Sequence, residues 1–179
     1  MNNIELAKIE IAKIIKNSVD APAGLHSTNT LEWLLKIKPD SDEALQIAAL
    51  AHDIERGFNG ENRLRVKSFA NYDEYKEAHS LEGSLIIGDL LEMLDFDEDF
   101  VNRVQKFVLN HEIGGDEETN ILMDADSLSY MEVNFDYYLQ YSGIEKTRFK
   151  LDYMYDRMTE RGKIVGKELY QRCLKKLIN

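Results

Sequence analysis

Apolar residues recur along most of the chain at spacings of three and four positions, which is the period of an amphipathic helix rather than of a strand. The first stripe of this kind consists of Ile4, Ala7, Ile11, Ile14 and Ile15. A second helix is predicted to begin at His26 or Ser27 and to end at Pro39, because proline lacks the N–H that another helical turn requires. Since the chain contains only 2 prolines, we predict an all-α fold.

A third helix is expected to follow Ser41, whose hydroxyl can cap its N-terminus, and to end at Gly57 and Gly60. A fourth helix is predicted over about 73–94, and a fifth after Asp97.

A sixth helix is predicted beyond Gly114 and Gly115, and its otherwise apolar stripe contains the carboxylate of Asp126. The remaining residues are expected to form one or two amphipathic helices, divided near Gly162 and Gly166.

The length of 179 residues, without a repeat or a long linker, predicts a single helical domain. We expect its ligand-bearing core over about 26–130 and its C-terminal helices over about 145–178. The chain has 33 acidic and 22 basic residues, and its net charge of -11 argues against nucleic-acid polymers and membranes as partners. Cys173 is the single cysteine, and no segment has the layout of a signal peptide or the length of a membrane span, so we expect a cytoplasmic protein. The sequence leaves a homodimer open.

Six residues of metal-ligand type fall near the starts of predicted helices or on inward stripes: His26, His52, Asp53, His79, His111 and Asp126. His52 and Asp53 end an apolar run, where an imidazole and a carboxylate are costly to bury unless they are paired or bind a cation. One inward histidine is more often a hydrogen-bonded core residue, but four with two aspartates would need many separate partners. Imidazoles with carboxylates suit Mn, Fe, Co, Ni or Zn better than Ca, and Mg stays among the candidate ions.

The order of these residues resembles the signature of the HD superfamily of metal-dependent phosphohydrolases, which is a His, then a His-Asp pair, then a distant Asp. The matching residues are His26, His52-Asp53 and Asp126, the last within Asp124-Ala125-Asp126-Ser127-Leu128, which is similar to the family's Ala-Asp-x-Leu segment. The resemblance implies an HD-type helical bundle in which these four side chains hold a divalent cation. Asp124 is then either an early-helix charge or an acceptor beside the site.

His79 and His111 resemble the additional pair found in HD proteins with two metals, where the Asp of the doublet bridges the ions. Elsewhere in the superfamily, similarly placed histidines contact substrate phosphate, and motif position alone does not separate these roles. The resemblance therefore implies one or two divalent ions.

The chain departs from the common family pattern after the His-Asp pair, where Ile54-Glu55-Arg56 replaces Ile-Gly-Lys. With Asp53 as a catalytic residue, Glu55 is predicted to shuttle protons or orient a histidine, and Arg56 to clamp phosphate. A surface ion pair is the alternative for Glu55 and for Arg56.

Basic residues farther along are candidates for contacts with substrate phosphate, against the alternative of a solvated helix start. They are Arg148, Lys150 and, beyond them, Arg157. Four aromatic residues are expected in the core or in a cavity wall: Trp33, Tyr137, Tyr138 and Tyr141.

Together these features favour hydrolysis of a small phosphorylated compound by metal-activated water. A nucleotide is the substrate class that superfamily analogy suggests. Two alternatives stay open. Some HD proteins with six ligands use two irons to activate oxygen on organic substrates, and a metal-stabilised sensor would bind a nucleotide without turnover.

Overall fold

The computed structural model describes residues 2–19 and 22–178, and all regular structure within them is helical, which confirms the predicted all-α fold. Two short 3₁₀ turns, η1 (Gly60–Asn62) and η2 (Val66–Ser68), lie between α4 and α5, and a π-helical segment, η3 (Tyr130–Asn134), joins α7 to α8. The α-helices are α1 (Asn3–Ile15), α2 (Ala23–Ile37), α3 (Glu43–Ala51), α4 (Ile54–Asn59), α5 (Tyr72–Met93), α6 (Glu98–Asn110), α7 (Glu117–Ser129), α8 (Phe135–Ser142), α9 (Ile144–Asp156) and α10 (Glu160–Lys176).

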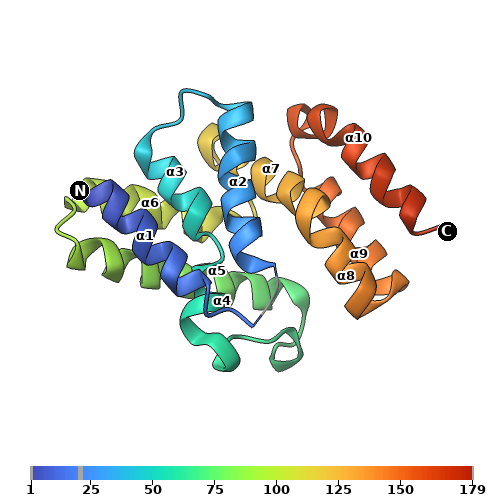
Figure 1. The fold of residues 1–179 in the computed structure, drawn as a ribbon, viewed down its shortest axis with the longest axis horizontal. Helices are drawn as coiled ribbons and strands as arrows, with labels where there is room; N and C mark the ends of the chain where they lie inside the picture. Colours follow the sequence, from blue (N-terminus) through green and yellow to red (C-terminus); the bar gives the residue numbers. More distant parts are fainter. Residues whose placement is uncertain (1, 20–21, 179) are drawn as a thin grey trace.

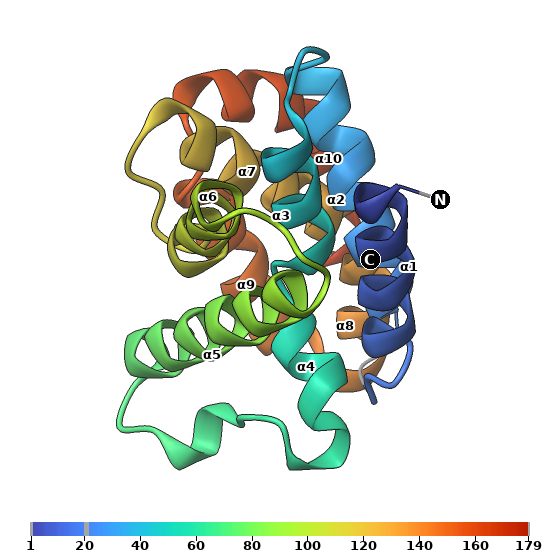
Figure 2. The ribbon, with the colours of Figure 1, turned by 90° about the vertical axis from the view of Figure 1, so that its left-hand side faces the viewer.

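The helices pack around a centre formed by α2, α3, α6 and α7 (Figure 1). Helix α2 contacts both α3 and α7, while α1 covers α3 and α4 at one end and the C-terminal helices α9 and α10 extend from the other. Helices α5 and α6 pack along each other on the face that is turned toward the viewer in Figure 2. Within the described ranges, none of the helices combines the length and apolar character needed to cross a bilayer.

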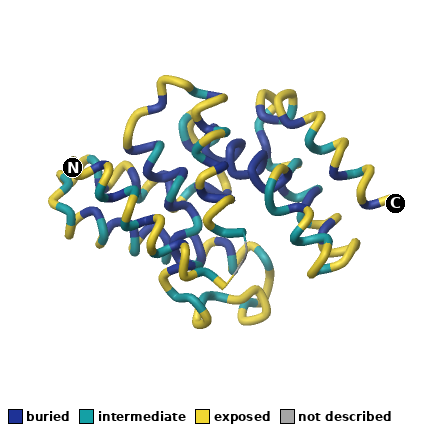
Figure 3. The backbone as a smooth tube through the Cα atoms, viewed as in Figure 1, coloured by how far each residue is buried: buried dark blue, intermediate teal, exposed yellow. Residues whose placement is uncertain are grey.

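The inward faces of these helices form one continuous apolar core, seen as the dark segments of the tube in Figure 3. Phe107, Tyr130 and Phe135 are among its largest fully buried side chains, together with Leu34 and Leu45. Burying a side chain of this size contributes about 1.5–3 kcal/mol, so the core fixes the helices that carry the candidate ligands.

Acidic and amide side chains cap half of the described α-helices, namely α1, α3, α5, α6 and α7. Asp42 accepts a hydrogen bond from the backbone N–H of Leu45 at 3.1 Å and caps α3. The predicted cap, Ser41, is therefore wrong by one residue, and Ser41 lies buried just outside the helix. Helix α2 also begins earlier than predicted, at Ala23, which places His26 inside its first turns.

The third predicted helix does not continue to Gly57, because α3 ends at Ala51 and α4 begins at Ile54. In a continuous helix, neighbouring residues point about 100° apart. The turn at His52 and Asp53 instead lets both side chains face the same interior site. Gly57 lies inside α4, where a Cβ would collide with the backbone of α1, so this glycine permits close packing and does not end the helix.

The C-terminal helices are divided before Gly162 and Gly166, not at them, which corrects the predicted boundary. Both glycines lie within α10 where it crosses α7. A Cβ on Gly162 would collide with the carboxylate of Asp124, and one on Gly166 would lie 2.9 Å from Leu128 Cδ2. Asp124 accepts hydrogen bonds from the backbone N and the hydroxyl of Thr159 at 2.8 and 2.5 Å, so it holds the start of α10 and acts as an acceptor away from the candidate ligands.

Candidate metal centre

Several segments, distant in sequence, converge on one interior site and bring all six candidate ligands together. Five of these side chains are almost completely buried, and that of Asp53 is 12% exposed. The six residues are His26 in α2, His52 and Asp53 in the turn after α3, His79 in α5, His111 at the C-terminus of α6, and Asp126 in α7.

Four of the candidate ligands, His26, His52, Asp53 and Asp126, form the first group. His26 Nε2 lies 3.0 Å from Asp126 Oδ1 and 3.2 Å from His52 Nε2. His52 Nε2 lies 3.5 Å from the same Asp126 oxygen, and Asp53 Oδ2 is 3.9 and 3.8 Å from the two histidine nitrogens. Two imidazole nitrogens and two carboxylate oxygens therefore face one small volume.

Asp53 also belongs to a second group, with His79 and His111. Its other oxygen, Oδ1, lies 2.9 Å from His79 Nε2. Candidate ligand atoms of these three residues all lie within 4.8 Å of one another. The two oxygens of Asp53 thus face different groups, so this carboxylate could supply one ligand atom to each group.

The backbone fixes the orientation of two of these histidines. His52 Nδ1 donates to the carbonyl of Ala49 at 3.0 Å, and His111 Nδ1 donates to the carbonyl of Val108 at 2.6 Å. Because a carbonyl can only accept, each Nδ1 carries the proton, and in the neutral imidazole Nε2 presents its lone pair to the interior.

Side chains orient the other two histidines in the same way. The hydroxyl of Ser129 donates to the backbone carbonyl of His26, so its oxygen accepts from His26 Nδ1 at 2.8 Å. Glu55 accepts from His79 Nδ1 at 2.9 Å. All four Nε2 atoms consequently point toward the two groups that share Asp53, an arrangement typical of metal-binding histidines.

Two observations test whether these residues fit a metal ion. The Nε2 atoms of His26 and His52 are 3.2 Å apart, so two lone pairs would repel each other unless a proton or a cation lies between or beside them. The Nε2 of His111 is buried without a hydrogen-bond partner, which is costly for a polar atom. Bound divalent ions would remove the repulsion between the two lone pairs and would give His111 Nε2 a partner. This set of nitrogen and carboxylate donors suits a first-row transition ion.

The electrostatics differ sharply between histidines. Burial lowers the pKa of His52, but the carboxylates of Asp53 and Asp126 outweigh it and raise that pKa to about 9. Burial lowers the pKa of His111 to about 4, because the nearby charges of His52 and His79 oppose the raising effect of Glu112. His111 is therefore a neutral candidate ligand at pH 7, whereas a metal that bound to His52 would displace a proton.

The two aspartates remain ionised. Burial by itself would raise the pKa of Asp53 and of Asp126. Arg56 beside Asp53, Arg157 beside Asp126, and His52 beside both instead hold the two pKa values well below the ordinary range. Both carboxylates are available as anionic ligands.

Glu55 and Arg56 occupy different positions around the centre. Glu55 is completely buried and, besides His79, accepts from the backbone N–H of Leu64 at 3.0 Å, so it is not part of a surface ion pair. The Nε of Arg56 lies 3.2 Å from Asp53 Oδ1, at the open side of the centre. Glu55 thus has the position of a histidine-orienting residue, and Arg56 that of a cation facing a ligand approaching the centre.

The two basic candidates on α9, Arg148 and Lys150, differ in their position relative to the centre. Lys150 lines the small space over the centre and donates to the hydroxyl of Tyr72 at 2.8 Å. Arg148 is 49% exposed and pairs with Asp152 at 3.0 Å, away from the centre. Only Lys150 is positioned for the predicted substrate contact.

A buried ion network beside Asp126 includes Arg157, a predicted phosphate-binding candidate, and two residues that the sequence did not reveal, Glu112 and Lys76. Arg157 contacts both Asp126 and Glu112 through its guanidinium group and donates to Ser127 at 2.9 Å. Lys76 Nζ lies 3.2 Å from Glu112. Because Glu112 directly follows His111, its place beside the centre could have been predicted from the sequence. Its pairing with Arg157 could not, since the two residues are 45 positions apart.

A cavity of about 210 Å³ adjoins the centre, and His26, Asp53 and Arg56 are among the residues that line it. Tyr137 and Tyr138 line it together with Tyr141, as predicted for a cavity wall. Trp33 lies elsewhere, partly buried against the core.

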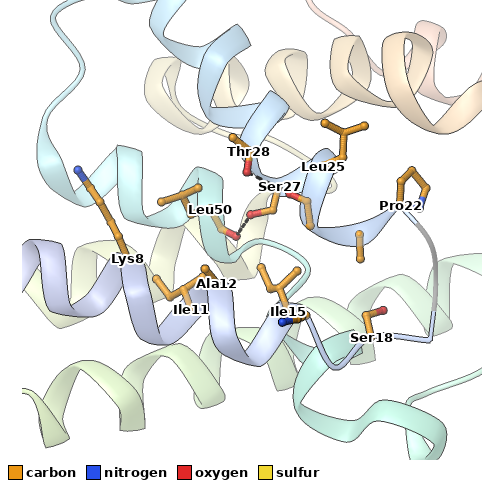
Figure 4. Close-up of a pocket in the computed structure, with 13 residues that line it drawn as sticks. Lys8, Ile11, Ala12, Ile15, Ser18, Pro22, Leu25, Ser27, Thr28 and Leu50 are labelled. Atoms are coloured by element: carbon orange, nitrogen blue, oxygen red, sulfur yellow. Dashed lines mark hydrogen bonds between the residues drawn. The ribbon is translucent and has the colours of Figure 1, made fainter.

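Another cavity, of about 340 Å³, lies between α1 and α2 (Figure 4). Its floor is formed by Ile11 and Ile15 of α1 with Leu50 of α3. None of the described residues that line it is a histidine or a carboxylate, so it lacks the donors that the central site concentrates.

Comparison with known proteins gives a family but no function. No curated protein matches the chain, and no solved structure matches it. A family model described as "Domain of unknown function (DUF4202)" matches residues 10–178, a range that includes all six candidate ligands. The chain therefore belongs to the DUF4202 family.

Proposed function

We propose that this protein is an HD-type metal-dependent phosphohydrolase that acts on a small phosphorylated compound. The observation that carries the proposal is the convergence of four histidine Nε2 atoms on two aspartates, with every Nδ1 hydrogen-bonded outward. This arrangement, together with the order of the residues in the chain, supports likeness to the HD superfamily. A nucleotide is the substrate class suggested by that analogy.

The residues divide between two ions. His26, His52, Asp53 and Asp126 would hold the first, and Asp53 with His79 and His111 would hold the second. Divalent ions at such a site lower the pKa of bound water and shield the negative charge on a phosphoryl group.

The charges of the site favour an anionic substrate. Two carboxylates do not neutralise two divalent ions, so the loaded centre is net positive although the protein carries a net charge of -11. Arg56 and Lys150 lie at the open side, where they would bind the nonbridging oxygens of a phosphate monoester. Hydrolysis forms one bond from water oxygen to phosphorus and breaks the ester P–O bond, and the leaving alcohol takes up a proton.

Metal analysis combined with phosphate release tests this proposal. Protein purified without chelator should contain one or two equivalents of a transition ion and should release phosphate from at least one nucleotide or sugar phosphate. Asp53→Asn should lose both ions and activity, whereas His79→Gln should lose one ion. If His79→Gln keeps full stoichiometry and only weakens substrate binding, the histidine contacts phosphate and the centre holds one ion.

Other outcomes would replace the proposal. Protein that binds no metal under any loading condition would refute the metal centre itself. Two irons with oxygen consumption and no phosphate release would indicate an oxygenase, and tight nucleotide binding without turnover would indicate a sensor.

A further inference from the structure

A cavity beside the centre has a more apolar lining than the centre itself. It has a volume of about 530 Å³ and lies between the N-terminal part of α5, the turn η2 and the helices α8 and α9. Its lining is mostly apolar and includes the rings of Tyr72, Tyr75, Tyr138 and Phe149. This size and apolar lining are typical of sites for small organic ligands.

The cavity adjoins the centre. Arg56, Tyr138 and Lys150 line both this cavity and the small space above Asp53 and Asp126. One bound molecule could therefore occupy both volumes.

A cavity ring also contacts a candidate ligand directly. Tyr75 stacks on the imidazole of His79, with ring centroids 6.0 Å apart and an angle of 15° between the planes. The wall of the cavity is thus one ring away from the second group.

The rings form a surface suited to a flat partner. Tyr72 and Tyr75 are stacked at 5.9 Å, and Phe149 meets Tyr72 edge-on at 6.1 Å. Phe149 is 61% exposed, although burial of so large an apolar side chain would be favourable. An aromatic group inserted here would stack on these rings and cover Phe149.

Two cations lie where the cavity adjoins the centre. Lys150 and Arg56 lie between the rings and the centre, while Glu145 and Lys146 lie exposed on α9. A ligand with an anionic group at one end and a planar ring at the other matches this order of cations and rings.

We propose that this cavity binds a planar aromatic group of the substrate, so that the substrate is an aromatic phosphate monoester with its phosphate toward Arg56 and Lys150. This inference rests on the proposed phosphohydrolase function. The ring would be recognised by stacking rather than by hydrogen bonds to its edge, so the cavity should not discriminate among rings by the polar groups on their edges.

Binding of nonhydrolysable phosphonates tests the ring preference without turnover. Benzylphosphonate should bind the metal-loaded protein more tightly than cyclohexylmethylphosphonate, which has a similar size but no aromatic face. Phe149→Ala should weaken benzylphosphonate binding by about 5- to 150-fold, the range expected for loss of one stacking contact. Phe58→Ala is the matched control, because Phe58 is equally exposed, at 62%, but lies outside the cavity.

Equal affinity for the two phosphonates, or equal effects of the two alanine substitutions, would overturn the inference. Failure to release phosphate from any ester would refute the proposed function instead, while the phosphonate affinities would still report on the cavity. The phosphonate analogue of adenosine monophosphate separates the two sources of the ring. Tighter binding than benzylphosphonate would indicate a nucleobase, and weaker binding a simple aryl group.

Discussion

Replacing Arg157 with methionine should destabilise the protein far more than replacing any exposed arginine. The side chain of Arg157 is 7% exposed, and it contacts Glu112 and Asp126, which are 7% and 6% exposed. Removing one partner of a buried ion pair leaves an uncompensated buried charge and costs about 3–5 kcal/mol. Lys76 still compensates Glu112 in the variant, so most of this cost falls on Asp126.

Arg148→Met is the matched control, since Arg148 lies on α9, which ends just before Arg157, and pairs with Asp152 one turn away. Its side chain is 49% exposed, and an exposed pair of this kind contributes about 0–1 kcal/mol. Urea unfolding of the two variants and the wild type, each treated with chelator, gives the two free-energy differences at unchanged m-values.

Metal adds a second check on the same variant. An ion bound by Asp126 would compensate the charge that Arg157→Met leaves behind, so the destabilisation should be smaller in metal-loaded protein. Equal costs for Arg157→Met and Arg148→Met would show that Arg157 does not hold a buried network. A cost that metal leaves unchanged would argue against Asp126 as a ligand.

Three further changes test individual parts of the structure. Glu55→Gln removes the carboxylate that orients His79 and should weaken metal binding about 10- to 100-fold in a metal titration, and an unchanged affinity would contradict the orienting role. Gly162→Ala forces a Cβ against Asp124 and should cost about 1–3 kcal/mol in urea unfolding, whereas Gly24→Ala has open space in α2 and should not destabilise. Asp116→Ala removes the cap of α7 and should cost about 1 kcal/mol at pH 7. Because the hydrogen bond from Lys106 and the cap lower the Asp116 pKa to about 2, this contribution is complete above about pH 4 and should fade as the pH falls toward 2. A difference from wild type that stays constant over this range would refute the assignment.

Helices with a regular stripe and a clear cap were predictable from sequence to within a residue or two. The helix predicted over about 73–94 is α5, Tyr72–Met93, and the one predicted after Asp97 is α6, with Asp97 as its cap. Local propensity and tertiary packing favour the same structure there, so the pattern alone is sufficient.

Elements defined by long-range contacts were not predictable in this way. The run before His52 is apolar on all sides, so a continuous helix and a helix broken at Asp53 have the same local pattern. Glycine is normally a sign of a helix end, but Gly162 serves the close approach of α10 to Asp124. Lys76 and Glu112 resemble residues of a solvated helix face, because the partner that buries Glu112 lies 45 residues later.

Two of the candidate ligands could be predicted from the sequence because each is a histidine at the end of an apolar stripe. His52 and His111 each follow the last turn of a helix, α3 and α6, and each donates Nδ1–H to the carbonyl three residues earlier. The last four carbonyls of a helix have no partner within it, so this hydrogen bond satisfies a free carbonyl and fixes the imidazole tautomer at once. A histidine in this position therefore points Nε2 away from its own helix, toward the part of the protein against which the apolar stripe packs. In this fold, both stripes face the core, and the two Nε2 atoms meet Asp53 and its neighbours there.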